Sequence, residues 1–151
     1  MDDVWRRDEY EISTDPARLR LDVVHGFLRT SYWAENIPRA VVARSVRHSL
    51  NFGVYRGGEQ VGYARVVTDR AVFGFVMDVF VLPPHRGRGL AKWLMATILA
   101  HPELQGFRRW MLTTKDAHGV YAQVGFTPCS APEQVMEIVR RNAYTAAPPG
   151  G

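Results

Sequence analysis

The apolar positions in the first third of the chain recur at the spacing of helices. Four of them lie three or four residues apart and would share one helical face: Leu21, Val24, Phe27 and Leu28. They predict a first helix that follows a strand over residues 9–13. Pro38 begins a second predicted helix that ends at His48 or Ser49, and residues 30–37 form the loop between the two helices.

The middle of the chain changes to the two-residue period of β-strands. Large side chains such as Val61 and Tyr63 alternate with small ones, which favours a strand over residues 60–68. A Gly-Gly turn separates this strand from another over residues 51–55, so the two predict a hairpin. The long apolar stretch over residues 72–82 predicts the central strand of the sheet.

The last third alternates between helical and extended patterns. A helix is expected over residues 89–100, where Pro102 ends it, and a strand is expected over residues 107–113. A short helix that carries a tyrosine follows that strand. A chain of 151 residues is about one domain, so we expect a single domain over residues 1–141 and a tail over residues 142–151, where prolines and glycines gather.

Composition fits a globular protein that needs neither disulfides nor metals for its core, with 46% hydrophobic and 23% charged residues. The longest apolar run, residues 71–82, contains Asp78 and is too short to cross a bilayer, so no membrane partner is expected. The acidic start lacks the features of a signal peptide, and the single cysteine, Cys129, suits a reducing compartment. We therefore expect a cytoplasmic protein. No residues have metal-ligand spacing, so no metal is expected.

The basic charge raises the question of nucleic-acid binding. The net charge is +4, and arginine supplies 17 of the 19 basic side chains. These arginines are scattered through the chain, and no helix-turn-helix, zinc or RNA-recognition motif accompanies them. The sequence therefore favours a protein without a nucleic-acid partner.

The turn after the central strand has the features of an anion site. A helix start leaves backbone N–H groups unpaired at the positive end of the helix dipole, where a phosphate can bind. Gly87 and Gly89 permit the positive φ that such a turn needs, and Arg86 and Arg88 add charged donors. The spacing excludes a P-loop, and Lys92 stands where a dinucleotide-binding turn would have its third glycine.

The spacing of this turn fits the pattern Arg/Gln-x-x-Gly-x-Gly/Ala at Arg86, Gly89 and Ala91, which resembles the acyl-CoA loop of the GNAT N-acetyltransferase superfamily. Residues 118–126, which contain a tyrosine and end in Gly-Phe, are similar to the second motif of that family. The resemblance covers nearly the whole chain. It implies an α/β (α+β) fold: a mixed, mostly antiparallel sheet flanked by helices, with a splayed central strand that holds acyl-CoA. It also favours a closing strand over residues 134–139.

The resemblance implies acetyl-CoA as the acyl-donor cosubstrate. Backbone groups at the end of the central strand would bind its pantetheine arm: Phe80, Val81 and Leu82. The loop amides would bind its pyrophosphate: Arg86, Gly87, Arg88, Gly89, Leu90 and Ala91. Asp116 stands near the position where many relatives have an asparagine. It would either cap the following helix, which is the favoured interpretation, or contact the pantetheine arm.

Two residues are candidates for proton transfer. Tyr121 occupies the place of the family's general acid, which protonates the departing thiolate, and the alternative is an aromatic that only packs on the core. Asp78 could attract the amine or accept its proton through water. It could equally form a structural ion pair with Arg65.

The acceptor pocket is expected at the loop between the first two helices. Tyr32, Trp33 and Glu35 could bind an amine through cation–π and charge contacts, and Thr113 could face the same pocket. The alternative is a hydrophobic lid that packs on the sheet.

The sequence thus predicts an acetyl-CoA-dependent N-acetyltransferase that acts on the amine of a small molecule or a peptide. The alternative is a non-catalytic acyl-CoA-binding module with the same fold. Because many relatives form dimers, the resemblance also favours a homodimer.

Overall fold

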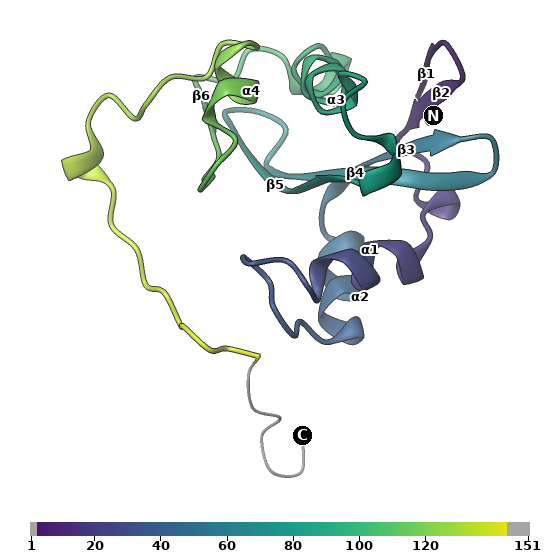
Figure 1. The fold of residues 1–151 in the computed structure, drawn as a ribbon. Coiled ribbons are helices and arrows are strands. Elements are labelled where there is room, and N and C mark those ends of the chain that lie inside the picture. The colour runs from purple at the N-terminus through teal and green to yellow at the C-terminus, as the bar shows by residue number, and fades with distance from the viewer. Residues whose placement is uncertain (1–2, 145–151) are drawn as a thin grey trace.

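The computed structural model describes residues 3–144, which form one sheet with helices on both faces (Figure 1). The strands lie side by side in chain order: β1 (Val4–Arg7), β2 (Tyr10–Ser13), β3 (Leu50–Arg56), β4 (Glu59–Thr68), β5 (Phe73–Val81) and β6 (Arg109–Met111). Neighbouring strands are antiparallel, except that β5 and β6 are parallel. The predicted fold class, a mixed and mostly antiparallel sheet with flanking helices, is confirmed.

The helices divide between the two faces of the sheet. α1 (Leu21–Leu28) and α2 (Arg39–Arg47) lie on one face, while α3 (Leu90–Leu99) and α4 (His118–Ala122) lie on the other (Figure 1). Short 3-10 helices occur at four turns: Pro16–Arg18, Pro83–His85, Pro102–Leu104 and Pro132–Gln134. The apolar positions that predict α1 are the ones that hold it in place, because Val24 and Leu28 are buried in a cluster with Tyr63 and Phe80.

The opposite face holds the larger core. Leu94, Met95 and Ile98 of α3 are fully buried against the sheet, where they pack with strand residues such as Val54 and Val66. Since α3 follows directly after β5, this packing fixes the turn between strand and helix in which the glycines lie.

A bulge in β5 divides the strand into two parts. Tyr63 pairs with Phe80, but Arg65 pairs with Met77, so β5 has one residue more than β4 between these two pairs. The extra residue lies at Asp78, whose φ of 57° is in the left-handed region. Pairing with β6 covers only Phe73–Phe75, so that β5 and β6 part beyond it. The splayed central strand is therefore present, and the bulge lies where the strands part.

The closing strand predicted over residues 134–139 was wrong. Within the described residues, 135–140 have neither helix nor strand and lead away from β6 (Figure 1). The apolar pattern fits a strand, but a strand needs a second strand to satisfy its backbone groups, and this single chain does not supply one there. Of the tail predicted over residues 142–151, residues 145–151 lie outside the described residues.

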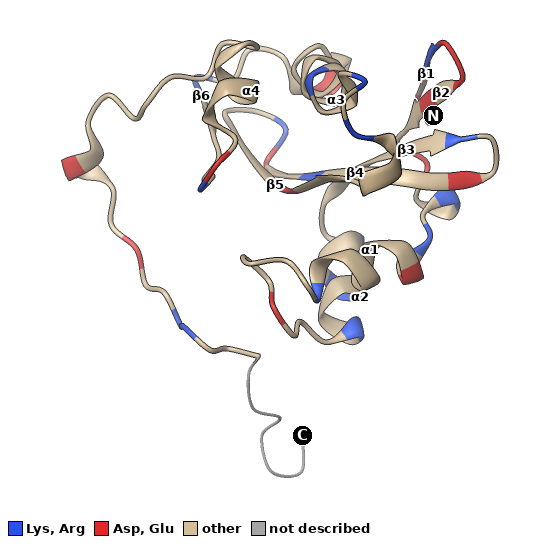
Figure 2. Ribbon diagram, in the orientation of Figure 1, with Lys and Arg blue, Asp and Glu red and all other residues tan. Residues whose placement is uncertain are grey.

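Charges are spread over the molecule. Lys and Arg alternate with Asp and Glu around the fold (Figure 2), and several form ion pairs, such as Arg18 with Glu11 and Arg70 with Glu103. Within residues 3–144, no helix has the length and apolar character that a membrane crossing needs, and no group of His, Cys, Asp and Glu could hold a metal ion.

Candidate active site

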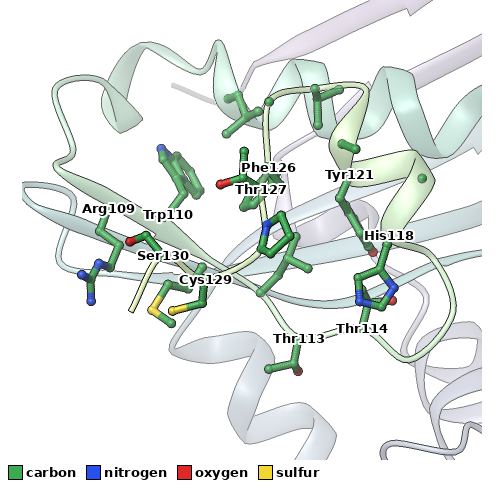
Figure 3. A pocket seen from close by; sticks show the side chains of 18 residues that line it. Arg109, Trp110, Thr113, Thr114, His118, Tyr121, Phe126, Thr127, Cys129 and Ser130 are labelled. Carbon is green, nitrogen blue, oxygen red and sulfur yellow. The ribbon is translucent and has the colours of Figure 1, made fainter. Parts of the chain in front are cut away.

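β6 has a cavity on each side. The splay cavity, of about 500 Å³, lies where β5 and β6 part and is lined by residues 75–79, residues 112–117, Tyr32, Trp33 and Tyr121. The outer groove, of about 940 Å³, lies between β6, α4 and residues 124–130. Figure 3 shows this groove with Arg109 and Trp110 at one end and Tyr121 and His118 at the other. Tyr121 lines both cavities and so stands between them.

The glycine turn before α3 has the predicted backbone. Gly87 and Gly89 have φ values of 80° and 74°, which only glycine adopts without strain. Gly89 is the N-cap of α3, and no side chain caps the first turn of that helix. The N–H groups at the start of α3, among them those of Leu90 and Ala91, are therefore available to an anion such as a pyrophosphate.

The arginines of this turn contact the protein. Arg86 donates from Nε to the carbonyl oxygen of Val81 at 2.9 Å, and Arg88 pairs with Glu9 at 3.3 Å. Arg7, which the sequence analysis missed, donates to the carbonyl oxygen of Arg88 at 3.0 Å. Its guanidinium also lies 5.0 Å from the ring centroid of Trp93. These side chains hold the loop in shape, so the anion site consists of backbone amides more than of arginine side chains. No local pattern around Arg7 could have indicated its contact with a loop 81 residues away.

The three residues predicted to bind the pantetheine arm are not equivalent. Leu82 donates its N–H to the carbonyl oxygen of Val61 in β4, and the carbonyl oxygen of Phe80 faces Gly62 in the same strand. Because backbone groups alternate along a strand, those of Val81 face the opposite, open side. The carbonyl oxygen of Val81 already accepts a hydrogen bond from Arg86. Among the backbone groups of Phe80, Val81 and Leu82, the N–H of Val81 therefore remains to bind a ligand.

Tyr121 is half-buried on α4, with its ring against Phe126 at 6.1 Å between centroids. Burial raises the pKa of the Tyr121 phenol, and the nearby Tyr32 and Asp116 raise it further. The hydroxyl therefore stays protonated through the physiological range. A protonated phenol at the wall of the splay cavity can donate a proton or a hydrogen bond to a departing sulfur.

Asp78 forms the ion pair that the sequence analysis left open. Its Oδ2 accepts from Nε of Arg65 at 2.6 Å, and its Oδ1 accepts from Nε1 of Trp33 at 2.9 Å. The pair is well buried, because the Asp78 side chain is 7% exposed and the Arg65 side chain 13%. A proton placed on Asp78 would break this pair, so the geometry favours a structural carboxylate that fixes Trp33 and the bulge.

Tyr32 and Trp33 reach over the splay cavity from the loop after α1. Their rings form an edge-to-face pair at 5.1 Å, and the Tyr32 hydroxyl accepts from the N–H of Lys115 at 3.1 Å. The ammonium of Lys115 lies 5.4 Å from the centroid of the Tyr32 ring, so a cation already lies beside this aromatic. The two rings thus connect the α1 face of the fold with the segment that precedes α4.

Two of the predicted site residues need correction. Glu35 is exposed and does not line the splay cavity, because its neighbour Ala34 is the residue of this loop that is buried in the cluster with Val24 and Leu28. Asp116 does not cap α4: Ala117 is the N-cap, and the Thr114 hydroxyl accepts from the Ala117 N–H at 3.0 Å. Asp116 is exposed at the splay cavity, which Thr113 also lines as predicted.

A sheet that opens at a bulge beside a glycine turn is the architecture of acetyltransferases with a GNAT fold. The chain belongs to the acetyltransferase (GNAT) family, whose sequence model matches residues 7–126. A protein of Gibberella zeae that is named as an acetyltransferase is 34% identical over 135 residues, which cover 74% of this chain and 75% of that protein.

Solved structures agree with this assignment. A Xanthomonas campestris pv. campestris protein, described as an acetyltransferase of the GNAT family, has a TM-score of 0.89 and 46% identity, over 93% of this chain and all of that one. An acetyltransferase of Clostridium acetobutylicum, crystallised with acetyl-CoA, has a TM-score of 0.63 and 12% identity over 92% of this chain and 96% of that one. At that identity the likeness concerns the fold alone.

Proposed function

We propose that the protein transfers the acetyl group of acetyl-CoA to a primary amine of a small molecule or a peptide. The observation that carries this proposal is the position of the splay cavity. The glycine turn follows the end of β5, and Tyr121 lies at the wall of the cavity that opens beside β5. A donor whose phosphates bind the turn can therefore extend its acyl arm along Val81 toward Tyr121.

Acetyl-CoA supplies a thioester that a neutral amine attacks directly. A C–N bond forms, the C–S bond breaks, the amine releases one proton to water, and the departing sulfur gains one from a protein group that water then reprotonates. Tyr121 donates the proton to the sulfur, and its raised pKa keeps that proton in place until transfer. The backbone N–H of Val81 and the amides of residues 86–91 position the donor.

Within residues 3–144, the splay cavity carries one exposed carboxylate without a partner, that of Asp116, beside the ammonium of Lys115. Asp116 is exposed at the cavity, and no hydrogen bond or ion pair holds its carboxylate within residues 3–144. We propose that Asp116 attracts the ammonium form of the amine and that Tyr32 and Trp33 cover its carbon chain. Asp78 acts as a positioning residue that holds Trp33 through its hydrogen bond.

The second candidate is a non-catalytic module that binds acyl-CoA. The pairing of Asp78 with Arg65 favours it, because this carboxylate is then not free to accept the amine proton. The two candidates differ in one result: the module binds acetyl-CoA and releases no CoA with any amine, whereas the enzyme releases CoA with at least one.

The first test is thermal unfolding with acetyl-CoA, CoA, ATP and NAD in parallel. A ligand at 100 times its dissociation constant adds about 2.7 kcal/mol of stability, which corresponds to a midpoint shift of several degrees. We expect a shift with acetyl-CoA and CoA alone. No shift with either would refute the donor site, and CoA release over a panel of small amines and peptides with free N-termini then separates enzyme from module.

The charge distribution and the single cysteine support the proposed kind of partner and the proposed location. The mixture of charges in Figure 2 favours a small-molecule or peptide partner over a nucleic acid. The free, exposed Cys129 is consistent with the cytoplasmic location that we propose.

A further inference from the structure

The splay cavity contains a lysine that the transfer to an external amine does not require. Lys115 is exposed in the segment before α4 and lines this cavity together with Tyr32 and Tyr121. The sequence holds one other lysine, Lys92, which is exposed on α3 and lines neither the splay cavity nor the outer groove. The two lysines therefore differ in their access to a thioester that is bound in the splay cavity.

Lys115 is fixed at its backbone and loosely held at its ammonium. Its N–H donates to the Tyr32 hydroxyl at 3.1 Å, which places the start of the side chain beside the cavity. Its ammonium lies 5.4 Å from the centroid of the Tyr32 ring, and within residues 3–144 no hydrogen bond or ion pair holds it. Because an exposed cation–π contact is weak and the lysine stem is flexible, the ammonium can leave the ring and turn into the cavity.

The chemistry of Lys115 differs from that of the other side chains in the cavity. Among the described residues that line it, Lys115 carries the only primary amine. Arginine supplies 17 of the 19 basic side chains of the chain, but a guanidinium stays charged and does not attack a carbonyl. A lysine amine becomes a nucleophile once it has lost a proton, and an exposed ammonium can lose that proton to water.

We propose that the protein acetylates its own Lys115, and that the acetyl-CoA bound to the same chain is the donor. This inference rests on the proposed function, because it needs a thioester in the splay cavity. The neutral Nζ of Lys115 attacks the thioester carbonyl, so that a C–N bond forms and the C–S bond breaks. The Nζ releases a proton to water, and the departing sulfur takes a proton from Tyr121, which water then reprotonates.

Acetylation changes the charge of the cavity. Lys115 and Asp116 are the two exposed charged residues among the described residues that line it, and their charges are opposite. An acetylated Lys115 is neutral, so the Asp116 carboxylate remains as the one exposed charge and the cation is removed from the Tyr32 ring. A cationic amine would then enter the cavity without repulsion from Lys115.

The test is the intact mass of the full chain after incubation with saturating acetyl-CoA in a buffer without amines, followed by peptide mapping. We expect one acetyl group per chain, on Lys115, and none in Lys115→Arg. Lys92→Arg is the matched control and should be acetylated within about 2-fold of the wild-type rate. Treatment with hydroxylamine removes an acetyl group from a thiol such as that of Cys129 and leaves the amide on Lys115.

The rate of acetylation separates a reaction in the protein's own cavity from chemical modification by free acetyl-CoA. We expect Tyr121→Phe to slow acetylation of Lys115 by about 100-fold, because it removes the proton donor. The rate per chain should not change when the protein is diluted. Equal acetylation of Lys115 and Lys92, an unchanged rate in Tyr121→Phe, or a rate that falls on dilution would each overturn the proposal.

Thermal unfolding of the same samples separates a failure of this inference from a failure of the proposed function. A midpoint shift with acetyl-CoA, or CoA release with an external amine, in a protein whose Lys115 stays unmodified would overturn self-acetylation alone. The absence of a shift, of CoA release and of acetylated Lys115 would overturn both.

Discussion

The two sides of β6 differ in the chemistry of the side chains that line them, although both belong to one strand. Toward β5, the sheet opens near the bulge at Asp78, and the cavity there carries an ion pair, the Asp116 carboxylate, the Lys115 ammonium and the Tyr121 phenol. Away from β5, the groove is walled by tryptophan, leucine, methionine and phenylalanine side chains and ends at an unpaired strand edge. Polar groups that converge in a cavity are typical of a ligand site, whereas an apolar edge is typical of a strand-pairing surface.

The difference lies in how the backbone of each side is paired. β5 and β6 pair over three residues on each strand and then part, which leaves unpaired the backbone groups of β5 that a pantetheine arm would bind. The bulge of β5 against β4 lies in this same stretch. The outer edge needs no such irregularity, because an edge strand is unpaired by its position alone. We therefore expect substitutions on the side facing β5 to affect turnover more than substitutions on the outer side.

The largest effect is expected from Tyr121→Phe. The change removes the proton donor and keeps the ring against Phe126. We expect kcat to fall by about 100-fold or more with little change in acetyl-CoA affinity, since general acids contribute this much. CoA release and binding calorimetry measure the two quantities. Tyr55→Phe is the control, because Tyr55 lies outside both cavities. Unchanged turnover in Tyr121→Phe would mean that the phenol only packs on the core.

The same phenol gives a prediction for pH. Burial raises the pKa of Tyr121, so the folded protein holds this proton more tightly than the unfolded chain does. The contribution of this proton to the free energy of unfolding is fully present below the pKa of the unfolded chain, which is about 10. It is lost as the pH rises through the pKa of the folded protein. Activity should therefore show no decline from this group below about pH 10. A decline at pH 8 that Tyr121→Phe abolishes would contradict the raised pKa.

Breaking the buried ion pair has the next largest effect. Asp78→Asn leaves the charge of Arg65 without its carboxylate, which costs about 3 kcal/mol in pairs of this kind. We expect the urea midpoint to fall, and the double change Asp78→Asn/Arg65→Met to recover most of the loss. In the double variant, KM for the amine should rise more than kcat falls, since a neutral amide oxygen accepts the Trp33 N–H more weakly than the Asp78 carboxylate does. A loss of kcat in both variants with unchanged KM would instead make Asp78 the proton acceptor.

Gly89→Ala has a smaller effect. A left-handed backbone costs a residue with a Cβ about 1 to 2 kcal/mol, so the N–H groups before α3 would move. We expect acetyl-CoA to bind about 10-fold more weakly, by the same calorimetry. Gly58→Ala is the matched control, because Gly58 lies in a turn without positive φ and has open space around it. Equal affinity in both variants would exclude the turn as the pyrophosphate site.

Sequence patterns were sufficient wherever local chemistry decides the structure. The periods of α1 and β4 follow from their own residues, and the positive φ of Gly87 and Gly89 follows from the turn that they form. The resemblance of Arg86, Gly89 and Tyr121 to two family motifs then indicated the fold and the cavity.

The rest depends on contacts that local sequence does not encode. Arg7 reaches the glycine turn only because the β1 and β2 hairpin folds beside it. Asp78 is paired because of the register between β4 and β5. Arg65 lies across from Met77, which is the residue next to Asp78. Residues 135–139 have the alternation of a strand, but they form none, because a pattern does not supply the neighbouring strand that the backbone groups need.

The smallest effect is expected from His118→Ala, and it tests the comparison most directly. His118 lies one turn before Tyr121 on α4, yet it lines the outer groove and not the splay cavity. If the chemistry belongs to the splay side, turnover and acetyl-CoA affinity should both stay within about 2-fold, which is less than 0.5 kcal/mol. A loss as large as that of Tyr121→Phe would place a proton-transfer group on the outer side of β6. The outer groove would then belong to the active site.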